Sequence, residues 1–510
     1  MVRDEIKKII EEAITELGLK SSKVLVEKPK DKTQGDYSTN IALALGRNPM
    51  ETAEAIKLKV ENLRRTSLRS RKKLKVFDKI EVIKPGFINF FLSQEYLQRQ
   101  IDEILKNKDK YGDLKIGKKE KVNIEFISAN PTGSLTLGNG RGGFGGGVLS
   151  NVLEKAGYDI TREFYINDRG KQIEDLKKGL YKGEKRTAAQ IQKENQKFIT
   201  EKLKIKFDVW FSEESLYENK EVGKTLALLK KKKLIYEKEG AFWFKSTGFG
   251  DDKNRVLIKK DGEYTYLASD IAYLKNKFQR GFKKLIFFWG ADHHGYINRI
   301  KAAAQALGYK KEQLDFIIMQ LVSVKEGNKS IKMSKRTGVF ITLGELINEV
   351  GLDAARFFFL ARAADSHLTF DLELAKKKSQ ENPVYYVQYA QARICSILEK
   401  FQIPNPKFKI NSKFQIPNSK LLNHPSELDL IKELIRFPEI IEDISKDYQV
   451  QRLPQYAVDL AESFHKFYQE CRVISNDKEK TKSRLALISA TQVVLKNTLN
   501  LMGITAPEKM

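Results

Sequence analysis

Residues 121–173, KVNIEFISANPTGSLTLGNGRGGFGGGVLSNVLEKAGYDITREFYINDRGKQI, decide how this chain folds. The apolar, partly alternating run Val122–Ile127 predicts a buried strand. Proline and glycine residues then predict a loop, and a glycine-rich helix is expected to begin near Arg141 and to end before Gly157. Ile160–Ile166 predicts a second strand. Such a unit places a helix N-terminus, with unpaired N–H groups, at the carboxyl edge of a parallel sheet, where phosphates bind.

The glycines of this stretch match a known nucleotide-binding pattern. Gly138, Gly140 and Gly143 satisfy the spacing GxGxxG, the fingerprint of dinucleotide-binding proteins. Glycine-rich turns satisfy this spacing often, so the match alone is weak evidence. It leaves a dinucleotide-dependent oxidoreductase open as one alternative.

A longer pattern surrounds these glycines. Glu125, Asn130, Pro131 and Gly133 precede LTLGNGRG, and the pattern continues through REFYINDRGKQI at 162–173. It resembles the first signature of class I aminoacyl-tRNA synthetases, in the form found in arginyl-tRNA synthetases. The resemblance extends over nearly the whole chain.

The chain departs from that family signature at two positions. The family has histidine where Thr136 and Asn139 stand here, and the resemblance implies that those histidines stabilise ATP phosphates in the transition state. The five histidines of this chain all lie at or after His293, so none can substitute locally. Threonine and asparagine can donate hydrogen bonds to a phosphate but carry no positive charge. A non-enzymatic RNA-binding relative is therefore a second alternative.

A basic pentapeptide follows much later in the chain. The run 332–336, KMSKR, resembles the second class I signature, and GLDAARFFFL at 351–360 continues the match. The resemblance implies that Lys335 places a positive charge on the pyrophosphate in the transition state, that Lys332 assists, and that Ser334 contacts ATP. A basic surface loop is the alternative interpretation, but several motifs in order are more specific than one.

The strand predicted within KKLIFFWGADHHGY, at 283–296, ends where polar residues begin. Ligands bind at such strand ends in open α/β sheets, and the resemblance implies that Gly290 and Asp292 contact ATP together with Gly138 and Gly140. The adjacent pair His293-His294 does not have the spacing of metal ligands on one helix face. We predict no tightly bound protein metal; Mg²⁺ is expected to enter with ATP.

Arginine selection requires carboxylates that form forked hydrogen bonds to a planar guanidinium. The resemblance implies that Glu125 and Asp270 are these carboxylates, that Tyr266 lines the pocket, and that Asn130 and His293 hold the backbone end of the amino acid. From the residues alone, Glu125 could equally be a satisfied strand-end carboxylate, and Asp270 a helix N-terminal residue favoured by the helix dipole.

The fold class predicted from these patterns is multidomain α/β, with a parallel-sheet catalytic domain of the Rossmann type. The expected domains are 1–110, a small α/β unit; 111–375, the catalytic domain, with an insertion at about 175–250; and 376–510, an all-helical unit. A strand is also predicted at 23–28.

The two outer domains resemble tRNA-binding domains of the same family. GDYSTN and PGFINFFLS resemble the N-terminal domain that grips the tRNA elbow, with Phe87 and Asn89 at positions that contact a nucleotide. The C-terminal helices resemble the DALR-type anticodon-binding domain. The tRNA-binding residues predicted there are Tyr385, Tyr389 and Met510.

Composition agrees with a polyanionic partner. The chain has 510 residues and a formal net charge of +26, which favours nucleic acid. Cys395 and Cys471 form no disulfide framework or zinc pattern, and no apolar run suggests a membrane span or a signal region. These features favour a cytoplasmic protein, and the resemblance implies a monomer that activates L-arginine with ATP and transfers it to tRNA(Arg).

Overall fold

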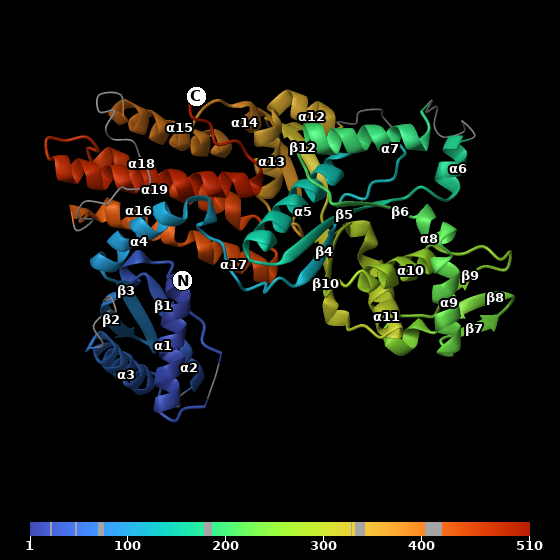
Figure 1. Cartoon of the computed structure of the whole chain (residues 1–510), viewed down its shortest axis with the longest axis horizontal. Helices are drawn as coiled ribbons and strands as arrows, with labels where there is room; N and C mark the ends of the chain where they lie inside the picture. Colours follow the sequence, from blue (N-terminus) through green and yellow to red (C-terminus); the bar gives the residue numbers. More distant parts are fainter. Residues whose placement is uncertain are drawn as a thin grey trace.

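The computed structural model describes residues 1–20, 23–45, 48–69, 76–177, 186–327, 329–331, 342–402 and 421–510. Figure 1 shows a central sheet with helices on both faces, a smaller α/β lobe beside it, a layer of long C-terminal helices, and an N-terminal unit below that layer. This arrangement confirms the predicted fold class. The predicted domain limits stay predictions.

The N-terminal unit is a small sheet covered by helices. Its strand order is β1-β3-β2, and both pairings are antiparallel. The prediction of a strand at 23–28 is wrong: this segment makes only the isolated bridge between Glu27 and Ser38. The elements are α1 (Val2–Glu16), β1 (Tyr37–Thr39), α2 (Ile41–Leu45), α3 (Pro49–Arg69), β2 (Phe77–Ile83) and β3 (Phe87–Leu92).

Buried and half-buried charges join this unit to the C-terminal helices. Tyr37 donates a hydrogen bond to Glu439 at 2.9 Å, and the Arg3 guanidinium donates to Asp443 at 3.0 Å. Lys28 pairs with Glu433 at 2.6 Å. The helix that comes after the unit, α4 (Gln94–Asn107), packs on two C-terminal helices, α16 (Pro425–Ile435) and α19 (Lys478–Met502). The first and last parts of the sequence are therefore in direct contact.

The central sheet has the strand order β11-β10-β4-β5-β6, and every pairing is parallel. The winding of the sheet reverses between β4 and β10. The chain adds β5 and β6 on one side of β4, and later adds β10 and β11 on the other side. Its described strands are β4 (Lys121–Glu125), β5 (Asp159–Ile166), β6 (Val209–Ser212), β10 (Lys284–Gly290) and β11 (Leu314–Met319).

Two details of this sheet differ from the expectations. β6 lies inside the range predicted as an insertion, yet it is the edge strand of the main sheet, so the inserted sequence is interrupted there. β4 ends at Glu125 rather than Ile127. Ile127 and Ser128 have positive φ values of 67° and 41°, which turn the chain out of the sheet and into the loop.

The glycine-rich helix α5 (Leu137–Lys155) begins four residues before the predicted Arg141. Its start is fixed by Thr136 and Asn139, which form a capping box that the glycine pattern does not reveal. The helix ends as expected, with Gly157 at φ 96°. Several glycines allow α5 to lie close to the sheet: a methyl group at Gly146 would be 2.7 Å from Cβ of Phe126.

The opposite face of the sheet is covered by α10 (Tyr266–Gln279) and α11 (Ile297–Leu307). Between β6 and α10 the chain builds the smaller lobe, whose sheet has the order β7-β8-β9. The remaining elements of this half are α6 (Lys171–Lys177), α7 (Ala188–Lys197), α8 (Glu214–Glu218), α9 (Glu221–Lys231), β7 (Ile235–Lys238), β8 (Ala241–Phe244) and β9 (Arg255–Ile258).

After β11 a small sheet of order β13-β12-β14 connects the catalytic core to the helical unit. The C-terminal unit is helical throughout its described residues, as predicted. The elements are β12 (Val322–Glu326), β13 (Lys329–Ile331), α12 (Leu343–Val350), α13 (Leu352–Leu360), β14 (Leu368–Asp371), α14 (Leu372–Lys376), α15 (Pro383–Gln402), α16, α17 (Phe437–Asp447), α18 (Arg452–Glu470) and α19.

Neighbouring glycines of α5 provide a matched test of this close packing. Gly146→Ala is expected to destabilise the protein by about 1–3 kcal/mol, because the added methyl group overlaps Phe126. Gly147→Ala meets only Ile205, at 3.8 Å, and is expected to stabilise it by about 0.5–1 kcal/mol through helix propensity. Thermal unfolding of both variants measures the difference; equal effects would contradict the packing.

Candidate functional site

The site lies where the winding of the sheet reverses. β4 and β10 are parallel neighbours, with Glu125 in register with Phe287, so their carboxyl ends open at the same edge. Crevices outside strand ends at such a reversal are the usual ligand sites of open α/β sheets. The N-terminus of α5 comes after β4 at this edge. The phosphate-binding geometry predicted from the sequence is therefore present.

Thr136 and Asn139 bond to each other at the start of α5. The Asn139 N–H donates to Thr136 Oγ1 at 3.3 Å, and the Thr136 N–H donates to Asn139 Oδ1 at 2.9 Å. The Thr136 hydroxyl also donates to Asn139 Oδ1, at 2.8 Å. This arrangement uses the oxygen atoms of both side chains to cap the helix. The Asn139 amide nitrogen takes no part in the capping box and keeps its capacity to donate.

The predicted ATP-binding glycines have different surroundings. Gly138 is exposed, and the atom nearest to an added methyl group is Thr136 Oγ1, at 3.6 Å. Gly140 is buried, and a methyl group there would lie 2.5 Å from Leu343 Cδ1. Gly138 therefore leaves the backbone open to a ligand, whereas the missing side chain of Gly140 makes room for α12.

The segment that follows the second signature in the sequence lies beside the loop of the first signature. Lys332, Ser334 and Lys335 lie outside the described residues, so the structure says nothing of their side chains. The chain resumes at Thr342, the N-cap of α12, and the Leu343 N–H donates to the Leu135 carbonyl at 3.0 Å. The start of α12 is thus anchored beside the loop that precedes α5.

At the end of β10 the chain enters a 3₁₀ helix, Ala291–Tyr296. The side chains of Asp292 and His293 are largely exposed, and His293 Nε2 lies 3.7 Å from Asp292 Oδ2. A methyl group at Gly290 would be 2.5 Å from Asp292 Oδ1, so only glycine permits this approach. Both side chains are therefore at the strand end and open to solvent, where the sequence placed them.

Asp270, on the second turn of α10, is held in a carboxylate-rich environment. Tyr296 donates a hydrogen bond to its Oδ2 at 2.5 Å. The pKa of Asp270 is raised from 3.8 to about 7, mainly by burial and also by the negative charges of Glu213 and Glu125, against the lowering effect of the hydrogen bond from Tyr296. Asp270 and Glu125 are therefore near one another, as the predicted pocket requires.

Asp270, Glu125 and Glu213 form a carboxylate cluster with Tyr296 beside it. Sequence analysis did not identify two of these residues, Glu213 and Tyr296. Glu213 is buried, accepts a hydrogen bond from Ser269 Oγ at 3.1 Å, and has a pKa raised mainly by burial. It comes directly after β6, so the strand-end argument applied to Asp292 would have found it once β6 was recognised. Tyr296 comes after the exposed pair His293-His294, and its contact with Asp270 joins two helices that sequence alone does not bring together.

The other predicted arginine-binding residues border the cluster. Tyr266, the first residue of α10, is 70% exposed, and its hydroxyl lies 3.1 Å from the position of a methyl group on Gly170. Asn130 is exposed in the loop after β4, and its carbonyl accepts from the Thr132 N–H at 2.8 Å. Both can reach a ligand in the crevice; their roles stay predictions.

A second candidate site lies in the C-terminal helices. A cavity of about 890 Å³ is lined by aromatic and basic side chains, and Arg393 lies over the rings of Tyr389 and Tyr468 at 5.3 and 4.6 Å. Met510 also lines it, whereas the half-buried Tyr385 is not among its lining residues. Stacked rings beside cations suit unstacked nucleic-acid bases.

The predicted nucleotide contacts of the N-terminal unit are less accessible. Phe87 is half-buried at the start of β3, but Asn89 is only 1% exposed and accepts a hydrogen bond from Ser38 at 2.7 Å. The described structure gives Asn89 an internal role, in joining β3 to β1. Its contact with a base stays a prediction that this geometry does not favour.

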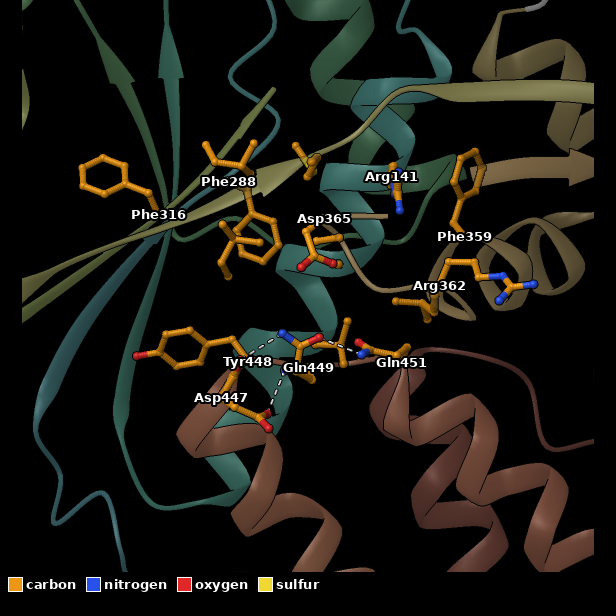
Figure 2. A pocket seen from close by; sticks show the side chains of 17 residues that line it. Arg141, Phe288, Phe316, Phe359, Arg362, Asp365, Asp447, Tyr448, Gln449 and Gln451 are labelled. Atoms are coloured by element: carbon orange, nitrogen blue, oxygen red, sulfur yellow. Dashed lines mark hydrogen bonds between the residues drawn. The ribbon is translucent and has the colours of Figure 1, made fainter. Parts of the chain in front are cut away.

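A third cavity, of about 210 Å³, lies on the α5 side of the sheet (Figure 2). Phe288 faces Asp365 and Arg141 across it, and the α17–α18 connection closes it with Tyr448 and Gln449. The Arg141 guanidinium is already used, since it donates to the carbonyls of Gln320, Ala363 and Ser366 at 2.6–2.7 Å. This cavity is separate from the carboxylate cluster.

Two other kinds of feature have no example among the described residues. No described helix is long and apolar enough to cross a membrane. No group of three or more His, Cys, Asp or Glu side chains is placed to hold a metal ion in the described part of the chain.

Three protein families match consecutive parts of the chain. Residues 4–92 match the arginyl tRNA synthetase N-terminal domain. Residues 100–200 and 185–371 match the catalytic domain of class I (R) tRNA synthetases, and residues 387–510 match the DALR anticodon binding domain.

Individual proteins agree with these families along the full length. Arginine–tRNA ligase 1 of Halalkalibacterium halodurans is 44% identical, covering 96% of this chain and 94% of the relative. The arginine–tRNA ligase of Bacillus subtilis is 43% identical over 100% and 99% of the two chains. The arginyl-tRNA synthetase of Thermus thermophilus has the same fold, with a TM-score of 0.79 over both whole chains at 20% identity. This chain therefore belongs to the arginyl-tRNA synthetase family, a family of class I aminoacyl-tRNA ligases.

Proposed function

We propose that the carboxylates Asp270, Glu125 and Glu213 form the pocket that selects arginine for the ATP-dependent charging of tRNA(Arg). The observation that carries this proposal is the raised pKa of Asp270, which burial and two neighbouring negative charges cause. Like charges gathered in a partly buried crevice are unfavourable unless a cation joins them. A guanidinium supplies that charge and matches carboxylates through paired hydrogen bonds.

The reaction proceeds in two steps. The arginine carboxylate attacks the α-phosphate of ATP, giving arginyl-adenylate and pyrophosphate; a hydroxyl of the terminal tRNA adenosine then displaces AMP. The chain contributes by positioning and by stabilising charge. Asn130 and His293 hold the backbone end of arginine, and Tyr266 covers its side chain.

The proposed ATP site combines the N-terminus of α5 with the end of β10. Gly138 and Gly140 bring backbone close to the phosphates, Gly290 and Asp292 contact the adenosine, and Mg²⁺ enters as part of the ATP substrate. Lys335, with Lys332 and Ser334, neutralises charge on the departing pyrophosphate. The anchoring of α12 beside Leu135 supports this, because α12 follows the second signature in the sequence and begins next to the loop that precedes α5.

Transfer RNA is proposed to extend over both outer units. The cavity around Tyr389, Arg393 and Met510 would take anticodon bases, and the surface near Phe87 would meet the tRNA elbow. The net charge of +26 supports an extended polyanionic partner. We propose that the protein acts as a monomer in the cytoplasm, where its free cysteines remain reduced.

Asp270→Asn and Glu125→Gln test the arginine pocket. Each should lower kcat/KM for arginine by about 10- to 100-fold, the equivalent of one charged hydrogen bond, and should leave the KM of ATP unchanged. The measurement is aminoacylation of tRNA with labelled arginine. Wild-type values for both variants would show that the pocket lies elsewhere.

The pKa of Asp270 predicts that kcat/KM for arginine depends on pH, and Asp270→Asn tests this. Because the free Asp270 carboxyl has a pKa of about 7, kcat/KM for arginine should fall about tenfold per unit as pH decreases below that value, and Asp270→Asn should abolish this limb. Because the pKa of Asp270 is raised on folding, ionisation of this carboxyl lowers the free energy of unfolding. The loss of stability is complete once the pH has risen through 7. Asp270→Asn should therefore raise the Tm above pH 7, and an unchanged Tm would contradict this environment.

The missing histidines lead to a prediction about the two signatures. Lys335→Ala should reduce arginine activation more than Thr136→Ala or Asn139→Ala, since loss of one neutral donor typically lowers a rate about 10²–10³-fold. Thr136→Ala should also lower stability by about 1 kcal/mol, because the cap of α5 is lost. Histidine at both positions should be tolerated or beneficial.

Pyrophosphate exchange in the presence of tRNA measures all these variants. Exchange that is unaffected by Lys335→Ala would show that the catalytic charge lies on another segment. Absence of exchange in the wild type, with tRNA still bound tightly, would instead favour a non-enzymatic RNA-binding relative.

The C-terminal cavity predicts which tyrosine matters for tRNA. Tyr389→Ala and Arg393→Ala should each raise the KM of tRNA about tenfold or more, as loss of one base stack does, and should leave kcat at saturating tRNA unchanged. Tyr385→Ala, on the same helix but outside the cavity lining, is the matched control. A larger effect of Tyr385→Ala would place the tRNA on another face of α15.

A further inference from the structure

Two buried carboxylates face each other beneath the proposed arginine pocket. Glu125 ends β4, and the parallel register places it directly opposite Glu163 on β5. Residues in register on neighbouring parallel strands point to the same face, and like charges in such a position repel each other. Glu163 is fully buried and Glu125 nearly so. The pair therefore requires a counter-charge within the protein.

Lys277 of α10 supplies a charge at this point. Its ammonium group, which is completely buried, lies 2.9 Å from Glu125 Oε2 and 3.0 Å from Glu163 Oε1. It also donates a hydrogen bond to Asn123 Oδ1, two residues before Glu125 on the same strand. The ring of Tyr273 lies 4.4 Å from the ammonium group.

The two carboxylates differ in what else they bind. Glu163 is held by the Arg280 guanidinium, by the Tyr273 hydroxyl and by the Asn123 amide at 3.0 Å. Burial raises the pKa of Glu163, but Lys277 first, and then Arg280 and Tyr273, lower it to about 2. Glu125 Oε2 is buried without an aligned hydrogen bond in the described structure, despite its proximity to Lys277. Lys277 is therefore shared by both carboxylates; Glu163 has Arg280 as a second cation, whereas Lys277 is the one ion-pair partner of Glu125 among the described residues.

We propose that Lys277 is a positioning residue for arginine recognition, which balances the charge of Glu125 and orients this carboxylate for the guanidinium of the substrate. This inference rests on the proposed arginine pocket and extends it below the residues that touch substrate. Lys277 does not contact the ligand; it contacts the carboxylate that does.

Several titratable groups determine how Glu125 responds when Lys277 is neutralised. Glu125 is faced by Glu163 from β5, by Tyr273 and Asp270 from α10, and, less closely, by Arg280; Tyr165 and Glu213 complete the surroundings on the same side. Without the ammonium group Glu125 has mainly negative neighbours, and like-charge repulsion displaces it from the position in which it can form a charge-assisted bond to the guanidinium.

Lys277→Met is the direct test, with Lys275→Met as the matched control on the same helix. Lys277→Met should raise the KM of arginine about 10- to 100-fold, with the KM of ATP unchanged. Arginine should also lose part of its advantage over citrulline, its uncharged isostere, as a competitive ligand. Lys275→Met should match the wild type.

A second variant separates an electrostatic role from a structural one. Glu163→Gln in the Lys277→Met background removes the negative charge that opposes Glu125 and restores the net charge of the cluster. If Lys277 acts by balancing the charge of Glu125, this double variant should recover most of the arginine affinity, even where Lys277→Met alone folds poorly. If Lys277 only supports the fold, the second substitution removes further hydrogen bonds and should worsen every measured property.

The outcomes are therefore distinct. An unchanged KM of arginine in Lys277→Met, or a double variant that folds but binds arginine no better than Lys277→Met, overturns the inference. Charging of tRNA with arginine by the wild type tests the proposed function separately. A wild type that charges arginine beside an unaffected Lys277→Met would remove only the role of Lys277.

Discussion

The parallel pairing of β4 with β10 is the constraint on which the site depends. It joins two halves of the chain that are separated by the whole smaller lobe, and it sets the ends of both strands at one edge. The proposed arginine- and ATP-binding groups that lie within the described residues are placed relative to that edge. Glu125 ends β4, α5 begins just beyond it, and Gly290 ends β10. A shift of one residue in this register would turn Glu125 to the opposite face, away from α10.

Close approach of α5 to the sheet is a second consequence of the sequence. Phe126 and Phe288 occupy the space that side chains at Gly146 and Gly145 would need. Of the three GxGxxG glycines, Gly140 packs against Leu343 and Gly143 against Ile127, and only Gly138 is open. This explains why GxGxxG alone was weak evidence: helix–sheet packing and phosphate binding both call for glycine, and the pattern does not distinguish them.

Much of the fold could be predicted from local patterns. The unit β4-α5-β5, the strand end at Gly290 and the C-terminal helices were predicted because periodicity, turns and caps are local. The start of α5 was wrong by four residues, since Thr136 and Asn139 were considered as phosphate donors rather than as a cap. β6 was assigned to an insertion because its pairing with β5 is non-local. The buried ion pairs of Lys277 were missed for the same reason. The available signal was that Asp270, Tyr273 and Lys277 recur on one face of a helix and form a polar stripe directed toward an apolar core.

Electrostatics links the stability of this site to its selectivity. The carboxylate cluster raises the pKa of Asp270 in the absence of a cation, while the deeper pair of Glu163 with Arg280 is compensated within the protein. The crevice therefore has unbalanced negative charge only where a substrate guanidinium can lie. Lysine, with a compact ammonium group, satisfies a forked pair of carboxylates less well than arginine.

The most direct test of this account is charging of tRNA by the wild-type protein with each of the twenty labelled amino acids in turn. The carboxylate pocket predicts that arginine alone is attached, in an ATP-dependent reaction. Attachment of lysine or of a neutral amino acid at a comparable rate, or of none while tRNA remains bound, would contradict it.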